Sequence, residues 1–247
     1  MKQDYYKLDT KALIGLIFDS LHLTVIHYGT WFRETEHQLG LDKAIEVDDI
    51  AWKRLLPIIL DRIAKRLKTP AEDGIPISLA NATKEELVEL LADMGKNWLA
   101  NDGVWFQAVE RDFDYEMYNA KRINDTCWMR FSYIEAKRIM KGLGLPERGG
   151  IPALREALKY RQYALVNKQE IIDVSENKII FRMNECRVQS ARNRANLLDY
   201  PCKSGGVVEY TRFAEGIDPR IKTTCIGCPP DPHPKEWYCA WELELIP

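Results

Sequence analysis

The sequence predicts an α+β protein, in which an N-terminal helical region is followed by a small α+β domain with an antiparallel sheet. Three observations lead to this prediction. Apolar residues at helical spacing and an internal repeat occupy residues 1–145, a break rich in Pro and Gly covers residues 146–150, and strand-like segments follow it. We therefore expect two domains, residues 1–146 and residues 147–247.

The helical region is predicted to contain four main helices in two similar pairs. Leu13, Ile17 and Leu21 belong to a first series at helical spacing, and a second series runs over residues 55–67. A capping box, Thr83-Lys-Glu-Glu86, starts a further helix. Pro70 and Pro146 are expected to end the second and the fourth helix.

An internal repeat supports the pairing of these helices. The segment Gly29-Thr-Trp-Phe32, followed by Glu36, recurs 74 residues later as Gly103-Val-Trp-Phe106, followed by Glu110. After a shift of two residues the match continues: Ala44, Asp49, Trp52, Arg62, Ile63 and Pro70 correspond to Ala120, Asp125, Trp128, Arg138, Ile139 and Pro146. Duplication of a helical hairpin explains this pattern, and we expect the repeated aromatic residues to be packed in a core.

The remainder of the chain alternates between helix and strand signals. A short helix is predicted over residues 151–163, and strands over residues 163–166, 170–174 and 178–183, the last two forming a hairpin. Helices are predicted over residues 188–198 and 207–216, and a final strand over residues 238–246.

The composition limits the classes of partner. A net charge of −2 gives no general attraction to nucleic acid or acidic membranes. The longest apolar segment, residues 12–26, is interrupted by Asp19, Ser20 and His22, and the N-terminus is too polar for a signal peptide. We therefore expect a cytoplasmic protein without membrane or nucleic-acid partners. Exposed Trp or Tyr side chains on the repeated helices would be compatible with a homodimer.

Four cysteines near the C-terminus predict a metal site. Cys225-Ile-Gly-Cys228 has the Cys-x-x-Cys spacing that lets two sulfurs reach one ion, while Cys202 and Cys239 supply two more. Four thiolates in a cytoplasmic protein form a closed tetrahedral site, which suits structural zinc. Three alternatives remain: His233 in place of one cysteine, a redox-active Cys-x-x-Cys pair, or an iron–sulfur cluster.

The first repeat carries polar residues that are candidates for lining a ligand pocket. His27, Glu34 and His37 lie within roughly 80° of one helix face. Glu34 and His37 have the Glu-x-x-His spacing of di-iron carboxylate bundles, but Arg111 stands at the position equivalent to His37 and no second such pair exists. We therefore interpret these three residues, together with Trp31, as ligand-binding rather than as a di-iron site.

A second set of candidates surrounds Cys186, the cysteine left over by the zinc site. At a helix N-terminus and beside Arg187, its pKa would fall and give a nucleophilic thiolate. Gln189 and Arg192 follow on roughly one face and are able to bind a carboxylate. Alternatively, Cys186 is a buried small residue and the arginines form ion pairs. In Asp218-Pro219-Arg220, Arg220 either reaches back to a carboxylate or lines the pocket with Arg192.

Two resemblances to known families add to this interpretation. The segments Cys202-Lys-Ser-Gly205 and Cys225-x-x-Cys228, with Cys239 opening the last strand, resemble the metal-binding end of the four-vinyl-reductase small-molecule-binding domains over residues 150–247. In their aromatic-sensing members zinc is held at similar spacing, with an acidic residue at the position of Cys225. The resemblance therefore implies a bound zinc ion and a small-molecule ligand.

The other resemblance spans nearly the whole chain. The repeated Trp-Phe-x-x-x-Glu, Cys186-Arg-Val-Gln-Ser-Ala-Arg192, Phe213-Ala-x-x-Ile-Asp-Pro-Arg220 and Cys225-x-x-Cys-Pro-Pro-Asp231 are similar to an uncharacterised bacterial and archaeal cytosolic family. That family is related to the L-2-amino-thiazoline-4-carboxylate hydrolase-like proteins, and the resemblance implies relatives without a settled reaction.

Two functions are consistent with these residues. In the first, the protein is a zinc-stabilised small-molecule-binding protein with a pocket between its helical and α+β parts. In the second, it hydrolyses a small carboxylate-bearing C–N or thioester substrate with Cys186 as nucleophile. The sequence favours binding, because no complete set of nucleophile, base and orienting group can be identified.

Overall fold

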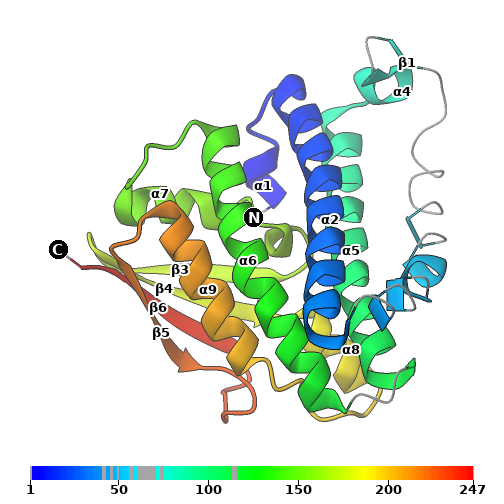
Figure 1. The fold of residues 1–247 in the computed structure, drawn as a ribbon. Helices are drawn as coiled ribbons and strands as arrows, with labels where there is room; N and C mark the ends of the chain where they lie inside the picture. Colours follow the sequence, from blue (N-terminus) through cyan, green and yellow to red (C-terminus); the bar gives the residue numbers. More distant parts are fainter. Residues whose placement is uncertain are drawn as a thin grey trace. The chain divides into compact units, whose positions relative to one another are not determined.

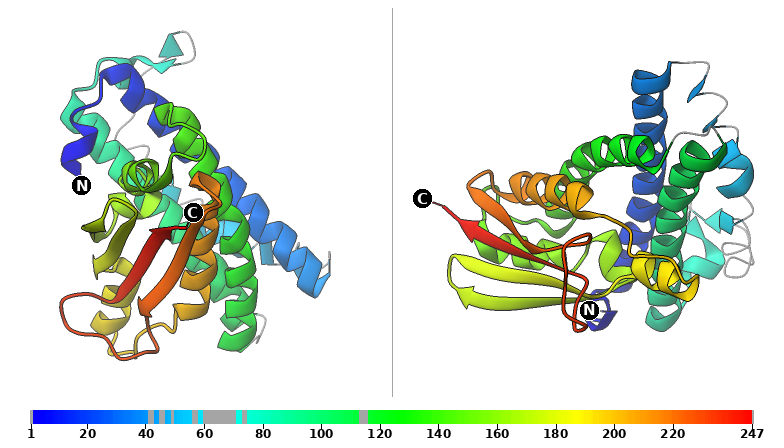
Figure 2. Two further views of the ribbon diagram at one scale, coloured as in Figure 1. Left: turned by 90° about the vertical axis from the view of Figure 1, so that its left-hand side faces the viewer. Right: turned by 90° about the horizontal axis from the view of Figure 1, so that it is seen from below.

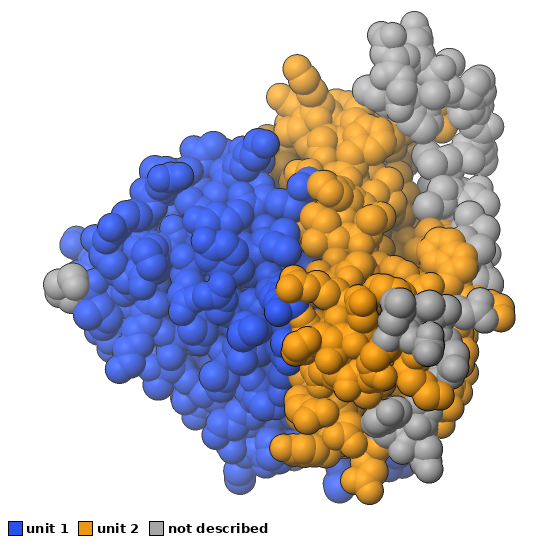
Figure 3. Space-filling view, viewed as in Figure 1, with its two compact units in different colours: residues 1, 125–247 blue, residues 2–124 orange. Residues whose placement is uncertain are grey.

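The computed structural model describes residues 2–40, 43–44, 47–48, 50–55, 58–59, 71–72, 75–112 and 116–246. As predicted, the protein is α+β, with long helices and a four-stranded antiparallel sheet (Figure 1). The chain divides into two compact units, which Figure 3 distinguishes by colour: Lys2–Asn124, here called the helical unit, and Asp125–Pro247, here called the sheet unit. The domain boundary predicted at residues 146–147 stays a prediction.

Two long helices, α2 and α5, dominate the helical unit. Asp9 caps the start of α2 by accepting a hydrogen bond from the Ala12 amide at 2.8 Å. The predicted capping box at the start of α5 is confirmed, because Thr83 and Glu86 each accept the other's backbone N–H. The elements of this unit are α1 Lys2–Tyr5, α2 Thr10–Leu39, β1 Ala71–Glu72, β2 Ile75–Pro76, α4 Ile77–Ala80, α5 Lys84–Gln107, the π-helix η1 Ala108–Asp112, and the start of α6 Met117–Leu143.

Part of the helix predicted over residues 55–67, and the predicted stop at Pro70, lie outside the described residues. Arg62 and Ile63, which support the internal repeat, lie there as well. The core position predicted for the repeated tryptophans is confirmed, because Trp31 and Trp105 are both fully buried.

Helix α2 is long and apolar enough, by length and composition alone, to cross a membrane. It lies near the N-terminus, and 28% of its most apolar window is buried within the protein. One such helix is weak evidence, because core helices of soluble proteins also meet this criterion. The cytoplasmic location predicted from the sequence therefore stays a prediction.

The sheet unit contains a sheet in the order β3-β4-β6-β5, with antiparallel neighbours throughout. Its elements are the later part of α6, α7 Gly150–Leu158, the 3₁₀-helix η2 Gln162–Leu165, β3 Lys168–Ser175, β4 Lys178–Glu185, α8 Arg187–Arg194, α9 Lys203–Ile217, β5 Ile221–Gly227 and β6 Cys239–Leu245. The predicted β3–β4 hairpin, the two helices after it and the final strand are confirmed.

One local prediction for this unit was wrong, and one strand was missed. Residues 163–166, predicted as a strand, are largely a 3₁₀-helix in which Gln162 and Leu165 are buried. Strand β5 was not predicted at all, because the Cys-x-x-Cys spacing of Cys225 and Cys228 suggested a tight turn. Instead, β5 pairs with β6 and places Cys225 opposite Trp241.

The core of the sheet unit lies between the sheet and helices α6, α7 and α9, which cover one face of it (Figure 2). Along β4, burial alternates, so that Ile179, Phe181 and Met183 face this core. Helix α9 packs closely against β6 and α6 because it carries glycines at these contacts. A Cβ atom at Gly206 would lie 2.5 Å from the indole of Trp241, and one at Gly216 would lie 2.6 Å from Ala136.

A fully buried arginine also joins three elements of this core. Arg161 lies between α7 and η2, and its Nε donates to Glu135 of α6 at 2.9 Å. Its Nη2 pairs with Glu209 of α9 at 2.8 Å, and its guanidinium lies 4.4 Å from the ring centre of Phe213. Because a buried charge needs compensation, these contacts fix α6 and α9 relative to η2.

Candidate functional site

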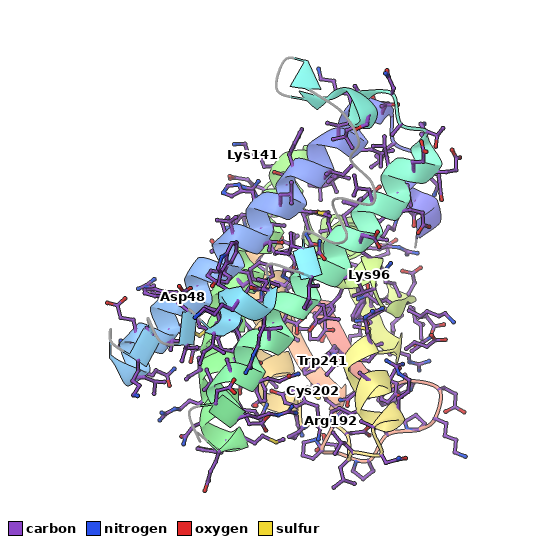
Figure 4. The ribbon with its side chains drawn as sticks, turned by 90° about the vertical axis from the view of Figure 1, so that its right-hand side faces the viewer. Asp48, Lys96, Lys141, Arg192, Cys202 and Trp241 are labelled. Atoms are coloured by element: carbon purple, nitrogen blue, oxygen red, sulfur yellow. The ribbon has the colours of Figure 1, made fainter. Side chains whose placement is uncertain are left out.

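Secondary structure brings the four predicted metal ligands together from three parts of the sheet unit. Cys202 is the residue before the first turn of α9, Cys225 lies in β5, Cys228 follows that strand, and Cys239 opens β6. The sulfurs of Cys202 and Cys228 are 3.5 Å apart, and Cys228 also hydrogen-bonds Cys239. Figure 4 labels Cys202.

The electrostatics of the cysteines reflect this crowding. Hydrogen bonding with Cys202 and Cys239, together with burial, raises the pKa of Cys228 far above its usual range. Burial also raises the pKa of Cys225, which lies within electrostatic reach of Cys239 and Cys202. All six cysteines of the chain are free thiols.

Among the described residues, the structure contains no group of three or more His, Cys, Asp or Glu side chains that is arranged to hold a metal ion. The sulfurs of Cys202, Cys228 and Cys239 are in contact, but the binding of a metal ion by the four cysteines stays a prediction. His233, the alternative ligand, is engaged elsewhere: its Nε2 lies 3.0 Å from Asp199 Oδ2 and its Nδ1 lies 2.8 Å from the Pro234 carbonyl.

Gln189 positions one of the four cysteines. Its amide exchanges two hydrogen bonds with the backbone of Tyr200, at 2.8 and 2.9 Å, and its Nε2 lies 3.5 Å from the Cys202 sulfur. The side chain is buried, so these contacts hold the loop before α9 in place. Gln189 therefore lies beside the cysteine cluster, and the predicted contact to a ligand carboxylate stays untested.

Cys186 begins helix α8, as expected, but its chemistry differs from the expectation. Burial raises the pKa of its thiol to about 12 and outweighs the backbone hydrogen bonds from Gln189 and Val188, which lower it. Its neighbours Cys239 and Cys202 raise it further. A thiol of this kind is almost entirely protonated at neutral pH, whereas a nucleophilic cysteine needs a lowered pKa.

The predicted arginines serve the fold in most of their contacts. Arg192 Nε donates to the Leu198 carbonyl at 2.6 Å. Arg220 reaches back to Asp218 with two hydrogen bonds, at 2.7 and 3.1 Å, as one of our two interpretations proposed. These bonds lower the pKa of Asp218, which also accepts from the Gly150 amide at 3.1 Å. For Arg187, the backbone N–H donates to Asn167 at 2.8 Å.

A second gathering of polar and aromatic side chains lies between α2 and α5 in the helical unit. We call it the α2–α5 layer; it comprises His27, Trp31, Trp98, Asn101, Asp102 and Trp105. Trp31 Nε1 donates to Asp102 Oδ1 at 3.4 Å, and His27 Nε2 lies 3.6 Å from the same oxygen. Trp31 stacks on Trp105 with centroids 5.8 Å apart and planes at 11°.

The two helices run side by side in the same direction (Figures 1 and 4). Trp31 and Trp105, which stack on each other, are 74 residues apart and are the two tryptophans paired by the predicted repeat. His27 contacts the ring of Trp98 at 5.9 Å, one turn before that stack. Burial lowers the pKa of His27 to about 3, so its imidazole is neutral at physiological pH.

Comparison with models of known protein families shows to which family the chain belongs. The model of a family of unknown function, DUF6125, matches residues 6–83 and 78–245. The protein belongs to the DUF6125 family. None of the curated proteins matches it, and neither does any solved structure. For this DUF6125 protein, the function must therefore be argued from its own residues.

The structure brings together only some of the predicted ligand-binding residues of the DUF6125 chain. His27, Trp31 and Glu34 are fully buried on one face of α2, whereas His37 is exposed. Glu34 and His37 thus do not share an environment, although their spacing is that of a di-iron motif.

Sequence reasoning named Trp105 only as a core residue, and it missed the other residues of α5 in this layer: Trp98, Asn101 and Asp102. They fall within about 100° of one helix face, and that spacing was the signal available for finding them.

Proposed function

We propose that this DUF6125 protein is a zinc-stabilised small-molecule-binding protein, in which Cys202, Cys225, Cys228 and Cys239 hold one structural zinc ion. The observation that carries the zinc proposal is the separation of 3.5 Å between the sulfurs of Cys202 and Cys228. Four thiolates at about 2.3 Å from zinc in a tetrahedron are about 3.8 Å apart. The sulfurs of Cys202 and Cys228 are therefore close to the separation that two ligands of one zinc ion have.

The charge around the cluster also suits this group. Zinc with four thiolates carries a net charge of −2, which requires compensation when it is partly buried. Cys202 begins α9, whose N-terminal end carries a partial positive charge. Lys203 lies within electrostatic reach of Cys225 and Cys228. Both features favour thiolates at this place once an ion replaces their protons.

Four protein ligands leave no open position on the ion, so the zinc would be structural rather than catalytic. It would tie the start of α9 to β5 and β6, whose pairing alone does not fix the loop that carries Cys202. Gln189 would keep Cys202 oriented, as partners of metal ligands commonly do.

The α2–α5 layer supports the ligand-binding half of the proposal. Helix cores seldom bury polar side chains, yet this layer buries the imidazole of His27 and the amide of Asn101 among indole rings. The internal duplication belongs to the same proposal: stacking of the equivalent Trp31 and Trp105 fits two copies of one helical element in register.

Metal and thiol analysis of the purified protein tests the zinc half. We expect about one zinc per chain, no iron, and four additional thiols that become reactive when a chelator removes the ion. A protein that stays folded without metal, with Cys225 and Cys228 oxidised, would instead support the redox interpretation. Iron with inorganic sulfide would support the cluster interpretation.

Hydrolysis with Cys186 as nucleophile is the second candidate. Its position at the start of α8, with hydrogen bonds from Val188 and Gln189, favours it. The pKa of about 12 opposes it, because burial dominates. Alkylation by iodoacetamide at neutral pH separates the two: a rate far below that of free cysteine fits the binding protein, and a rate well above it would favour the hydrolase.

A further inference from the structure

Helix α2 carries a second apolar face, on the side of the helix opposite its buried residues. Phe18, Leu21 and Val25 follow one another along this face and are 40%, 37% and 68% exposed. Single exposed apolar residues are common, but three in succession on one helix face form a patch of the kind that marks an interaction site. The most apolar window of α2 is only 28% buried within the protein. Helix α2 therefore presents an apolar surface to its surroundings.

The exposed positions of α2 follow a heptad pattern. They alternate in steps of four and three residues, which is the spacing of the a and d positions of a coiled coil. Seven of the eight positions are exposed, and Phe32 is half-buried. At a rise of about 1.5 Å per residue, the pattern extends over about 38 Å. We call this set the α2 stripe; it consists of Lys11, Gly15, Phe18, His22, Val25, Gly29, Phe32 and Glu36.

The α2 stripe is complementary in size to a reversed copy of itself. When Phe18 of one helix faces Gly29 of an antiparallel copy, every a position faces a d position, and Phe32 faces Gly15. Each of these layers then combines a large side chain with a small one, which is how well-packed interfaces interdigitate. A Cβ atom at Gly15 or Gly29 would meet nothing within 4 Å, so both positions have room for a ring from outside the chain. Glycine also weakens a helix interior, and close approach of a partner is a reason for its presence there.

The charges at the two ends of the α2 stripe favour the same antiparallel arrangement. Lys11 at the first position then faces Glu36 at the last position of the other copy, and two-fold symmetry forms this pair twice. A parallel pair would instead place lysine opposite lysine and glutamate opposite glutamate. Such ion pairs add little affinity, but they determine the orientation in which two surfaces bind.

We propose that two copies of this protein form a dimer through the α2 stripe, with their α2 helices packed antiparallel about a two-fold axis. Phe18 and Phe32 of each copy fill the spaces beside the glycines of the other, and His22 faces Val25 in the two central layers. A second copy explains the alternation of large and small residues and the opposite charges at the ends, whereas a lipid surface explains neither. The inference is independent of the zinc and ligand-binding proposals.

Sedimentation equilibrium of the full-length protein tests the dimer. We expect a species of twice the 28.7 kDa of one chain, which dissociates on dilution. Gly29→Leu is the main variant, because leucine fills the space that Phe18 of the other copy would occupy, whereas alanine would leave most of it open. Leucine also favours a helix more than glycine does and has open space around its Cβ, so the monomer should fold. We expect the dissociation constant of the dimer to rise at least about tenfold.

The matched control is Gly103→Leu in α5. Gly103 is the glycine that the predicted repeat pairs with Gly29, and the position of its Cβ is equally open, but it is not part of the α2 stripe. Its dissociation constant should equal that of the wild type. Circular dichroism of both variants should show the helix content of the wild type.

A charge exchange tests the antiparallel orientation. Lys11→Glu and Glu36→Lys each place like charges together at both ends of the pair, and each should raise the dissociation constant roughly fivefold. The double variant Lys11→Glu/Glu36→Lys restores opposite charges and should return to within about twofold of the wild type. All three variants should fold, because a glutamate near the start of a helix and a lysine near its end suit the helix dipole.

Four results would overturn the inference. The first is a monomer at concentrations up to about 0.1 mM. The second is a dimer that Gly29→Leu weakens no more than Gly103→Leu does. The third is a double charge variant that dimerises no better than the single variants. The fourth is a monomer that sediments with phosphatidylcholine vesicles, which would assign the α2 stripe to a lipid surface.

Discussion

The two units assemble polar groups in different ways. In the sheet unit, the turn before α9 and the β5–β6 pair bring four cysteines together from residues 202 to 239, a segment of moderate length. In the helical unit, α2 and α5 bring His27 and Trp31 together with residues more than 70 positions away in the sequence. None of these residue types by itself indicates a site. The cysteines can be grouped from the sequence by residue type and spacing, whereas the α2–α5 layer can be identified only when the two helices are placed side by side.

The units also differ in what stabilises them. The sheet unit places a charge network around Arg161 in its core and the cysteine cluster at one end of the sheet. The helical unit relies on long helices with buried apolar faces and indole stacking. We therefore expect substitutions and pH to affect them differently, and five changes test this in order of decreasing effect.

Cys228→Ser should have the largest effect, because it removes a central sulfur of the cluster. We expect loss of bound zinc and loss of folding free energy on the order of 10 kcal/mol for the metal-dependent part. Hydrogen exchange should report this loss in β5, β6 and α9 before α2 and α5. Cys127→Ala, a buried thiol of α6 outside the cluster, is the control and should keep its zinc. Equal zinc content in both variants would contradict the assignment.

Arg161→Met tests the buried charge network of the sheet unit. It leaves Glu135 and Glu209 without their cation, and we expect destabilisation of about 3–5 kcal/mol in chemical denaturation. Arg155→Ala, which breaks the exposed pair with Asp173, should cost less than about 1 kcal/mol. Similar effects of the two variants would show that burial does not decide the strength of these pairs.

His27→Phe tests burial in the helical unit through pH. The pKa of His27 is about 3 in the folded protein and 6.5 when unfolded, so the unfolded chain takes up the proton first. The contribution of the neutral His27 to the free energy of unfolding is therefore present above pH 6.5. It is lost as the pH falls toward 3, and the loss amounts to up to a few kcal/mol. The wild type should therefore lose more stability than His27→Phe between pH 7 and about pH 4. Parallel stability curves would contradict a buried neutral imidazole.

Gly206→Ala and Gly29→Ala compare close packing with open surface. A Cβ at position 206 meets the buried Trp241 ring at 2.5 Å, so we expect destabilisation of about 1–3 kcal/mol. Nothing lies within 4 Å of a Cβ at position 29, which is on the exposed side of α2, so alanine should stabilise by up to about 1 kcal/mol. Thermal unfolding of both variants should shift in opposite directions, and shifts of equal sign would show that the α9–sheet contact is looser than described.

Asp199→Asn should have the smallest effect. Burial lowers the pKa of His233, but hydrogen bonds to the Pro234 carbonyl and to Asp199 outweigh it and raise the pKa overall. The contribution of His233 to stability is therefore complete at a pH below its pKa in the unfolded chain. This contribution is lost as the pH rises through its pKa in the folded protein, which is the opposite of the behaviour of His27. The NMR titration of His233 should move to lower pH in Asp199→Asn. An unchanged titration would show that this contact does not hold the loop.

The sequence predicted best where local chemistry decides the structure. The capping box at Thr83, the β3–β4 hairpin and the grouping of Cys202 with Cys228 follow from neighbouring residues or from the chemistry of one residue type. Strand β5, Ile221–Gly227, was missed because the Cys-x-x-Cys spacing at its end suggested a turn, and its pairing with β6 is a tertiary effect.

The candidate sites show the same limit. The N-terminal position of Cys186 was predictable, but the raised pKa was not, because burial depends on neighbours from other elements. The role of Gln189 depends on Tyr200 in a loop with no periodic pattern. Asn101 drew no attention because a single asparagine inside a helix has no distinctive signature.

X-ray absorption at the zinc edge tests the central claim most directly, because it reports the atoms bound to the ion. We predict about one zinc per protein with four sulfur neighbours at about 2.3 Å and no nitrogen or oxygen neighbour. Replacing Cys202 or Cys239 by serine should lower the sulfur number or abolish binding. A first shell that contains nitrogen or oxygen in the wild type, or an absence of zinc from folded protein, would contradict the four-cysteine site.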